Sequence, residues 1–361
     1  MLLKLLRQTD RNEFDPVVIS LKDAGVVGEA ISSLGITVLS CNMTPEAPDP
    51  AVVMRLARIL KELRPHLVQT WMYHSDLIGG IANKMAGSAT LAWNIRHSQL
   101  DPATVKRSTI LIGKICAKMS GVLPDRILCC SEVAKEVHLQ LGYNRPKFHV
   151  IPNGFELAEY RPDIARRANI REELGISEEA LVIGHVGRYH PMKDHRSFVR
   201  AAKSLSSRMD NVYYVLCGDD VDWNNEELSM WIRSADLESR FRLLGRRSDL
   251  PSVNAALDIA TLCSTYGEGF PNVVGEAMAC AIPCVVTNVG DSAYIVGDTG
   301  TVIEPGNPDA LGHAWFDMLT LDNDKRKALG ALARERMETK FDIAAVVKQY
   351  QNLYRELVNA H

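Results

Sequence analysis

Short apolar runs alternate along the chain with longer segments in which apolar residues recur every three or four positions. The short runs are rich in β-branched residues and end at turn residues, which predicts strands. The first series is Val17–Leu21, Ile36–Ser40, Leu67–Trp71, Thr90–Ile95, Arg126–Cys130 and Phe148–Ile151. The second series is Leu181–Val186, Val212–Cys217, Arg242–Leu244, Ile259–Cys263, Pro283–Val286 and Thr301–Ile303.

The longer segments predict helices between the strands. In Pro50–Leu63, for example, one face carries Val53, Leu56, Ala57 and Leu60. Regular alternation of strands and helices is typical of parallel sheets that helices cover on both faces. The sequence therefore predicts an α/β protein, and the two series of strands indicate two domains.

The break between the two series lies at Ile151–Pro162. A Pro-Asn-Gly turn ends the preceding strand, and no apolar period resumes before Leu174. This favours a linker between domains over an ordinary surface loop. The chain opens on an amphipathic helix with Leu2, Leu3, Leu5 and Leu6 on its apolar side, where an alternating domain normally opens on a strand.

Composition fits this picture of a globular protein. Apolar residues make up 46% and charged residues 24% of the chain, and no apolar run approaches the roughly 20 residues of a membrane-spanning helix. The first ten residues are too short for the core of a signal peptide. The eight cysteines lack zinc-ligand spacing, so we expect buried, reduced thiols in a cytosolic protein.

The net charge of −3 hides an asymmetry between the halves. Residues 1–150 carry 18 basic and 13 acidic residues, and the remainder carries 23 and 31. A basic first half could face an anionic acceptor or a membrane surface, with random surface variation as the alternative. Within it, Asp101–Gly121 places Arg107, Lys114 and Lys118 at helical spacing with Ile110, Leu111 and Ile115 between them. We expect these apolar residues to pack on the first domain, with membrane contact as the alternative.

The stretch "EGFPNVVGEAMA" begins at Glu268 and opens a predicted helix over Asn272–Cys280. Pro271 suits the first helical position, and the first helical N–H groups lack acceptors, so they attract phosphate. The helix would face the sheet with Val273, Val274, Ala277 and Met278. Glu268 and Glu276 could each bind sugar hydroxyls. Alternatively, Glu268 only offsets the helix dipole and Glu276 is solvated.

A second stretch, "VIGHVGRYHPMKDH", places two cations just after a predicted strand. The strand ends at Val186, and Gly187, Arg188 and Lys193 follow it. Ligands bind at the carboxyl ends of strands in α/β domains. A guanidinium fork and an ammonium group together could clamp a pyrophosphate.

These two stretches together resemble the retaining glycosyltransferases of family four. "GRYHPMKDH" is similar to the family's Gly-Arg…Lys motif, and "EGFPNVVGEAMACAIPCVVTNVG" to its Glu-x7-Glu motif. "CSEVAKEVHLQLGYNRPKFHVIPNGF" also looks like the family's interdomain passage. The resemblance implies a GT-B fold of two Rossmann-like domains whose parallel sheets face each other across a cleft. Residues 1–153 would form the acceptor-side domain, lacking its usual first strand and joined by the C-terminal helix 341–361. Residues 154–340 would bind the nucleotide sugar.

The resemblance also implies roles for individual residues. Arg188 and Lys193 would bind the donor diphosphate beside Gly187, Glu268 would contact the donor sugar, and Glu276 would bind the ribose. The loop would be shaped by Gly269, Phe270, Pro271, Asn272 and Val273, and the base would lie near Gly218, Leu244 and Arg246. The implied catalytic set is His97, Arg188, Lys193 and Glu268. Ser98 follows His97 where the family often has Asp, and Arg96 and His74 are acceptor-side candidates.

We therefore predict a retaining glycosyltransferase that needs no metal or cofactor and uses a UDP- or GDP-linked sugar as donor. Asp220-Val-Asp222 matches an Asp-x-Asp metal motif by spacing, but Arg188 and Lys193 already supply positive charge. We expect a glycan, lipid-linked or small-molecule acceptor, no nucleic acid, and a cytoplasmic protein, with peripheral contact of the N-terminal domain with the inner face of the membrane as the alternative. The alternatives are a catalytically impaired donor-binding relative, motivated by the missing first strand, and a sugar-nucleotide epimerase. No Gly-x-Gly-x-x-Gly follows an opening strand, which argues against a nicotinamide oxidoreductase.

Overall fold

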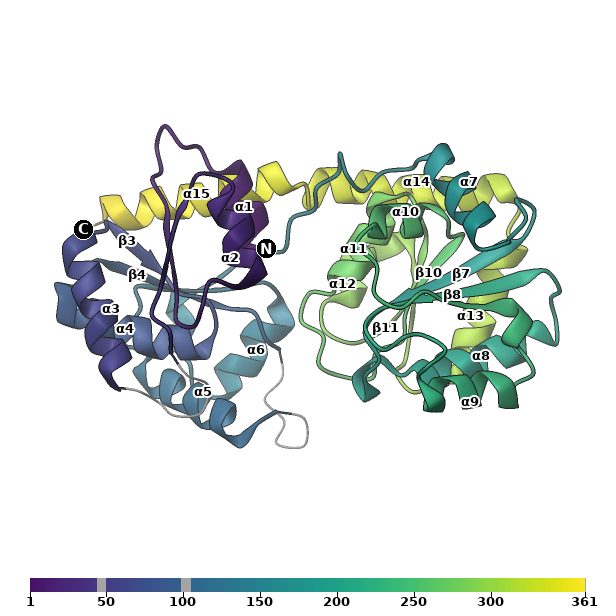
Figure 1. Cartoon of the computed structure of the whole chain (residues 1–361), viewed down its shortest axis with the longest axis horizontal. Coiled ribbons are helices and arrows are strands. Elements are labelled where there is room, and N and C mark those ends of the chain that lie inside the picture. Colours follow the sequence, from purple (N-terminus) through teal and green to yellow (C-terminus); the bar gives the residue numbers. More distant parts are fainter. Residues whose placement is uncertain (44–49, 99–104, 361) are drawn as a thin grey trace. The chain divides into compact units, whose positions relative to one another are not determined.

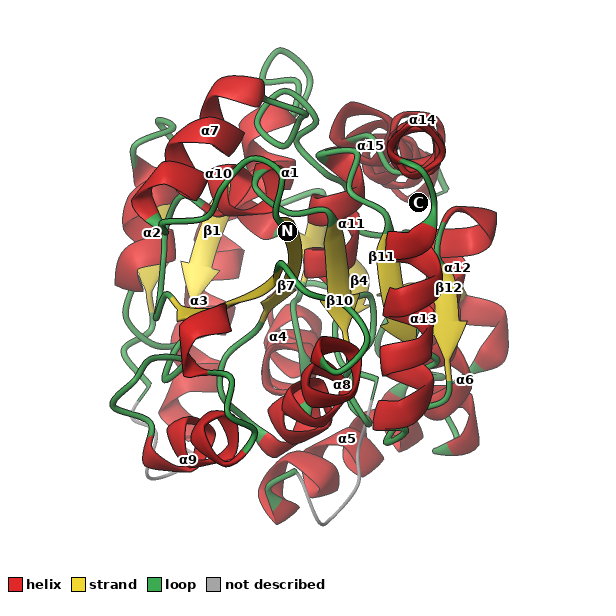
Figure 2. Cartoon of the chain, turned by 90° about the vertical axis from the view of Figure 1, so that its right-hand side faces the viewer, coloured by secondary structure: helices red, strands yellow, loops and turns green. Residues whose placement is uncertain are grey.

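The computed structural model describes residues 1–43, 50–98 and 105–360 (Figure 1). The chain divides into two compact units. Unit 1 comprises Met1–Gly154 and Ile343–His361, and unit 2 comprises Phe155–Asp342. Each unit is an α/β structure in which strands and helices alternate. Figure 2 distinguishes the helices, in red, from the strands, in yellow.

Unit 2 is built on one six-stranded parallel sheet in the order β12-β11-β10-β7-β8-β9. Its strands are β7 Leu181–Val186, β8 Val212–Cys217, β9 Phe241–Leu243, β10 Ile259–Leu262, β11 Cys284–Thr287 and β12 Thr301–Ile303. Its α-helices are α7 Ile164–Glu173, α8 His195–Ser206, α9 Glu226–Ser234, α10 Leu250–Ala255, α11 Asn272–Ala279, α12 Ser292–Val296, α13 Pro308–Thr320 and α14 Asn323–Lys340.

Helices cover both faces of this sheet. On one face α8 packs against α9 and α13, and on the other α11 packs against α10, α12 and α14 (Figure 1). An aromatic cluster fills the first layer, in which Phe198, Tyr214, Phe241 and Trp315 are buried and contact one another. Because each strand is covered on both sides, the strands read as almost continuous apolar runs.

Unit 1 contains two parallel sheets, β1-β2 and β3-β4-β5-β6. The strands are β1 Val17–Ser20, β2 Thr37–Ser40, β3 Leu67–Gln69, β4 Thr90–Ile95, β5 Arg126–Cys129 and β6 Phe148–Val150. The α-helices are α1 Leu2–Gln8, α2 Gly25–Ser32, α3 Pro50–Leu63, α4 Tyr73–Ala86, α5 Arg107–Met119, α6 Glu132–Gln140 and α15 Ile343–Asn359. The last helix belongs to this unit because Val346, Val347 and Tyr350 pack on strand residues Ala92 and Leu128.

All twelve predicted strands are present, and no strand end differs from its prediction by more than two residues. The first series is divided between two sheets, because no described strand hydrogen-bonds the β1-β2 pair to β3–β6. In α3 the buried apolar residue of the first turn is Val52 instead of the predicted Val53, which is only partly buried. Val52 stands one helical turn before Leu56 and therefore shares its face.

The opening helix and the thiols agree with their predictions. Leu5 and Leu6 of α1 are buried, and all eight cysteines are buried and form no disulfide bond. Helix α5 differs from its prediction. Leu111 and Ile115 face solvent, whereas the smaller Gly113, Cys116 and Ala117 face the interior.

Candidate functional site

The turns that follow β7, β8 and β9 meet at the carboxyl edge of the unit 2 sheet. The Gly187 N–H donates to the Cys217 carbonyl at 2.8 Å, and the Gly218 N–H donates to the Gly245 carbonyl at 2.9 Å. Leu244 is held in the same way, by its N–H to the Leu216 carbonyl at 2.9 Å. These bonds extend the parallel ladder past the strand ends and bring the predicted residues Gly187, Gly218 and Leu244 to one edge.

Gly218 is required by the close approach of two backbones. A Cβ at this position would lie 2.2 Å from the Gly187 carbonyl oxygen and 2.8 Å from the Arg188 nitrogen. No real Cβ tolerates such distances against backbone atoms, so a side chain would push the two turns apart. Only glycine therefore keeps the Gly187–Arg188 turn in place.

The Gly218→Ala variant is accordingly expected to lose about 1–3 kcal/mol of stability, the usual cost of overpacking, and to bind a donor nucleotide more weakly than wild type. Gly121→Ala is the matched control, because its Cβ would meet nothing closer than 3.5 Å. Urea denaturation and nucleotide titration measure the two effects. Unchanged nucleotide affinity in Gly218→Ala would contradict a role for this turn in binding.

Lys193 and Glu268 form a largely buried ion pair. Lys193 Nζ lies 2.6 Å from Glu268 Oε1, and the two side chains are 12% and 10% exposed. The Ser264 hydroxyl donates to the same carboxylate oxygen at 2.7 Å. Thr265 N–H donates to the Met192 carbonyl at 2.9 Å, which ties the two segments together through the backbone as well. The structure thus joins the two motifs that lie far apart in the sequence.

The other predicted cations are more exposed. Arg188 is exposed and forms no ion pair with a described residue. The Arg246 side chain is 84% exposed, and its Nε lies 3.5 Å from Asp219 Oδ1. Lys193 is therefore the only one of the three that the protein fixes beside the Glu268 loop.

The loop after Glu268 is braced from behind by the turn that follows β11. Asp291 N–H donates to the Gly269 carbonyl at 2.8 Å. Gly290 has φ +59°, and a Cβ there would lie 2.3 Å from the Glu268 carbonyl oxygen. Sequence reasoning missed Gly290, Asp291 and Ser264. The Gly-Asp pair after a strand was the available signal for a tight turn.

Helix α11 begins at Asn272, and Pro271 is its N-cap with φ −68° and ψ 107°. The prediction that Pro271 takes the first helical position was therefore off by one residue. Pro271 has no side-chain oxygen that could cap the helix. Within the first turn, the Val274 N–H donates to the Pro271 carbonyl at 3.3 Å. Phe270 is buried beside Phe155 and Phe341, at ring distances of 6.3 and 5.5 Å, which fixes the loop that enters the helix.

Glu276 lies on the buried side of α11. Its residue exposure is 9%, so the alternative that it is a solvated side chain is wrong. Val274, Ala277 and Met278 are buried as predicted, and Val273 is partly buried. Burial raises the pKa of the nearby Tyr160 well above its usual range, and the negative charge of Glu276 contributes to the shift.

Two buried histidines lie behind the Gly187 turn, and sequence reasoning gave them no role. The rings of His185 and His195 are 4.9 Å apart and nearly perpendicular. Burial lowers the pKa of His185 to about 4 and that of His195 to about 2. Both imidazoles are therefore neutral at neutral pH, and the ammonium of Lys193 carries the positive charge of this buried region.

In unit 1 the predicted residue His97 follows β4 and is half-buried. Its ring lies edge-on to Tyr73 at 6.4 Å. Tyr73 is buried and shares a 2.6 Å hydrogen bond with His138 Nε2. His138 Nδ1 lies 2.6 Å from the Ala134 carbonyl. A carbonyl only accepts, so Nδ1 carries the proton and Tyr73 donates to Nε2.

Other polar groups gather at this edge of unit 1. The Arg96 guanidinium lies over the Trp71 ring at 5.5 Å and donates to the Asn153 side chain. Ser98 is buried and His74 is exposed. Met72, directly after β3, has φ +76°, a strained value for a residue with a side chain and one found often at functional sites.

The Asp-x-Asp motif lies in a turn after β8. Asp220 has φ +59°, and an Asp222 carboxylate oxygen accepts the Asn224 N–H at 2.8 Å. Within residues 1–43, 50–98 and 105–360, no three His, Cys, Asp or Glu side chains are grouped so that they could hold a metal ion. The turn accounts for Asp222, and the prediction of metal independence stays a prediction.

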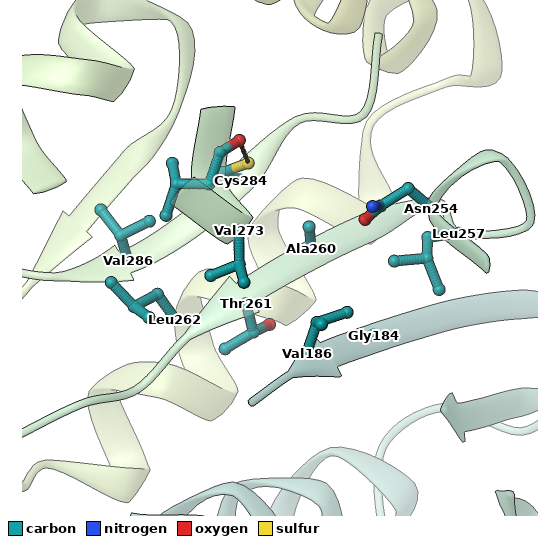
Figure 3. A pocket seen from close by; sticks show the side chains of 11 residues that line it. Gly184, Val186, Asn254, Leu257, Ala260, Thr261, Leu262, Val273, Cys284 and Val286 are labelled. Atoms are coloured by element: carbon teal, nitrogen blue, oxygen red, sulfur yellow. Dashed lines mark hydrogen bonds between the residues drawn. The ribbon is translucent and has the colours of Figure 1, made fainter. Parts of the chain in front are cut away.

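A small cavity lies between the sheet and helices α10 and α11 of unit 2 (Figure 3). Val186, Leu257, Leu262, Val273 and Val286 are among its mainly apolar lining residues. Thr261 also lines the cavity, and its hydroxyl oxygen accepts a hydrogen bond from Trp315 Nε1 at 2.9 Å. None of the charged residues of the two motifs lines this cavity.

Comparisons with known proteins agree with this architecture. The model of the glycosyl transferases group 1 matches residues 166–336, and that of glycosyltransferase family 4 matches residues 1–159. An Escherichia coli relative, UDP-Gal:alpha-D-GlcNAc-diphosphoundecaprenol alpha-1,3-galactosyltransferase, is 26% identical over 86% of this chain and 80% of its own. A D-inositol 3-phosphate glycosyltransferase of Kineococcus radiotolerans is 30% identical over 73% of this chain and 66% of its own.

The crystal structure of Anabaena Alr3699/HepE in complex with UDP has the same fold. Its TM-score is 0.85 at 22% identity, and the match covers 98% of this chain and 95% of that one. The fold is GT-B, with two Rossmann-like domains, as predicted. The protein is thus a sugar-transferring enzyme, and the chain belongs to the group 1 glycosyltransferases of family four. No helix in the described part of the chain is long and apolar enough to cross a membrane.

Proposed function

We propose that this enzyme transfers a sugar from a nucleotide diphosphate to a glycan or lipid-linked acceptor with retention of the anomeric configuration. The observation that carries the proposal is the buried Lys193–Glu268 pair beside the N-terminus of α11. An ammonium group and the positive end of a helix dipole attract phosphate, and a carboxylate binds sugar hydroxyls. One site therefore offers partners for both parts of a sugar diphosphate.

The proposed chemistry follows from where charge develops. Cleavage of the anomeric C–O bond leaves a negative charge on the departing diphosphate, which Lys193, Arg188 and the N-terminus of α11 would stabilise. The transferred sugar passes through an oxocarbenium-like state. The acceptor hydroxyl attacks from the face that the diphosphate leaves, and the departing phosphate oxygen takes its proton. This route needs no protein nucleophile.

The remaining residues would position the donor and the acceptor. The buried Glu276 would bind the ribose, and the turns at Gly218 and Leu244–Arg246 would contact the base. In unit 1, His97 would lie against the transferred sugar. Ser98 stands where the family often has an aspartate that could orient this histidine, and here the ring contact with Tyr73 would orient it instead. The E. coli relative is named for UDP-galactose and a diphosphoundecaprenol-linked acceptor, which supports a UDP-linked donor and a lipid-linked acceptor here.

A thermal-shift screen with UDP-, GDP- and ADP-sugars tests the donor site. We expect one class of nucleotide to raise the melting temperature of the wild type, because a ligand that binds only the folded state stabilises it. The Arg188→Ala and Lys193→Ala variants should lose that shift. Equal stabilisation of the wild type and both variants would refute the assignment of these two cations to the diphosphate.

Chelation of divalent metals with EDTA is expected to leave sugar transfer unchanged. The positive charge that a metal would supply is provided by Lys193, Arg188 and the N-terminus of α11. Product formation with and without EDTA measures the effect. Strong inhibition that added Mg²⁺ or Mn²⁺ reverses would instead implicate Asp220 and Asp222.

A further inference from the structure

Helix α5 packs Ile112 and Met119 against the core of unit 1, but it leaves two other large apolar residues at the surface. Gly113, Cys116 and Ala117 face the interior, whereas Leu111 is 59% and Ile115 37% exposed. The apolar residues of an amphipathic helix normally face the core, as Ile112 does, so Leu111 and Ile115 lie outside the core-facing side of α5. Packing within unit 1 therefore does not explain the two exposed side chains.

Cations share this exposed face of α5. Helical spacing places five residues of α5 on one stripe: Arg107, Leu111, Lys114, Ile115 and Lys118. Most successive members of this set are three or four residues apart, which is the distance between neighbours on one side of a helix. All five are exposed. None of the three cations forms an ion pair with a described residue. The stripe, called the α5 stripe below, thus combines positive charge with apolar side chains.

The neighbouring helix α4 has the same character. It packs against α5 (Figure 1) and exposes Ile81, Lys84 and Met85. The only acidic residue in either helix is Asp76, which is fully buried. No carboxylate of these two helices therefore offsets the positive charge at their surface.

The charge pattern selects the occupant of this surface. A second copy of the chain that docked through the same stripe would bring cations against cations, which like-charge repulsion opposes. An anionic lipid surface satisfies both halves of the pattern, because phosphate headgroups attract the cations and the acyl boundary accepts Leu111 and Ile115. We propose that the α5 stripe docks this enzyme on an anionic membrane surface. This proposal rests on the proposed function, because an enzyme with a lipid-linked acceptor must reach that acceptor at the surface of the bilayer.

Co-sedimentation with lipid vesicles tests the proposal on the full chain. We expect the wild type to bind vesicles of phosphatidylcholine and phosphatidylglycerol more tightly than phosphatidylcholine alone, and less tightly as salt rises. Each cation near an anionic surface contributes about fivefold in affinity, so Lys114→Glu/Lys118→Glu should weaken binding at least about 25-fold. Leu111→Ser/Ile115→Ser should weaken binding to anionic vesicles at every salt concentration.

Two double variants serve as matched controls. Lys327→Glu/Lys348→Glu makes the same change of charge at exposed positions of α14 and α15, and Met230→Ser/Leu332→Ser removes exposed apolar groups from α9 and α14. Both should bind anionic vesicles as the wild type does. Circular dichroism establishes that each variant is folded.

Three results would contradict the proposed docking surface. The wild type could fail to bind anionic vesicles, or the Lys114→Glu/Lys118→Glu variant could bind them as tightly as the wild type. The wild type could also bind polyglutamate but not vesicles. Concentration-dependent dimers that the Leu111→Ser/Ile115→Ser change dissolves would overturn it as well. The thermal-shift screen separates this outcome from failure of the proposed function. Donor stabilisation without vesicle binding rejects only the α5 stripe, and vesicle binding without donor stabilisation rejects the donor site.

Discussion

The Lys193→Ala variant is expected to transfer sugar about 10²- to 10³-fold more slowly than wild type, the usual effect of removing one preorganised group that stabilises developing negative charge. Two losses combine in this variant. The ammonium no longer stabilises the departing diphosphate, and the buried Glu268 carboxylate, 2.6 Å from Lys193 Nζ in the wild type, loses its counter-ion. That uncompensated carboxylate would repel the donor. Initial rates at saturating and limiting donor give the effects on kcat and kcat/KM.

A second variant separates the two losses. Lys193→Ala/Glu268→Gln removes the ammonium and the uncompensated charge together, so donor binding should recover relative to Lys193→Ala while kcat stays low. Arg188→Ala is the comparison for an exposed cation, and we expect a smaller effect because solvent screens it. Wild-type turnover by Lys193→Ala would remove the basis of the proposed mechanism.

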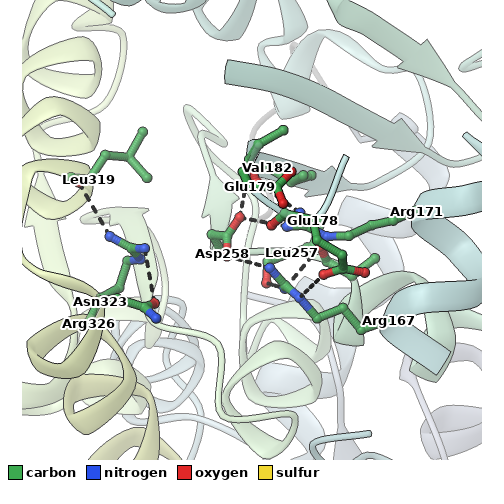
Figure 4. Close-up of polar contacts among 12 residues, drawn as sticks. Arg167, Arg171, Glu178, Glu179, Val182, Leu257, Asp258, Leu319, Asn323 and Arg326 are labelled. Carbon is green, nitrogen blue, oxygen red and sulfur yellow. Dashed lines mark hydrogen bonds and ion pairs between the residues drawn. The ribbon is translucent and has the colours of Figure 1, made fainter. Parts of the chain in front are cut away.

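The Asp258→Ala variant is expected to lose about 3–5 kcal/mol of unfolding free energy, the usual cost of leaving a buried charge unpaired. The Asp258 carboxylate accepts hydrogen bonds from Arg171 Nη2 at 2.8 Å and Arg167 Nη2 at 2.9 Å (Figure 4). It also accepts the Val182 N–H at 2.7 Å. The Arg171 side chain is only 1% exposed. Burial lowers the pKa of Arg171, but its guanidinium remains charged and would have no carboxylate partner. Urea denaturation measures the loss.

The same unit contains a matched control for this experiment. Arg233 and Glu238 form an ion pair at 3.0 Å, but their side chains are 62% and 57% exposed. Glu238→Ala should therefore cost no more than about 1 kcal/mol, as exposed pairs usually do. Similar losses in both variants would mean that burial is not what makes the Asp258 cluster important.

The order of strands and helices could be predicted from the sequence because it depends on local patterns. Apolar runs bounded by turn residues marked all twelve strands, even the three-residue β12 Thr301–Ile303. Errors arose where neighbours in sequence compete for one face. Val53 was predicted for the buried face of α3, but the adjacent Val52 is the residue that is buried. A pattern of four apolar positions does not determine which of two neighbouring valines faces the core.

The candidate site was predictable as two separate motifs. The Gly187–Lys193 and Glu268–Glu276 segments were both singled out, and their kinds of side chain indicated phosphate and sugar. The residues that support them were missed, because Ser264, Gly290 and Asp291 act through hydrogen bonds and close backbone approach to segments far away in the chain. Nothing in the local sequence around these three residues specifies those partners.

The sequence by itself determined the α/β alternation and the identity of the charged groups, since both follow from residue types and their spacing. Only the tertiary structure decided that Lys193 pairs with Glu268, that Glu276 is buried, and that α5 turns Leu111 and Ile115 outward. Exposure and ion pairing depend on what packs against a side chain from elsewhere in the chain. A helical pattern shows that a stripe exists, but the neighbouring elements determine whether that stripe faces the core or the solvent.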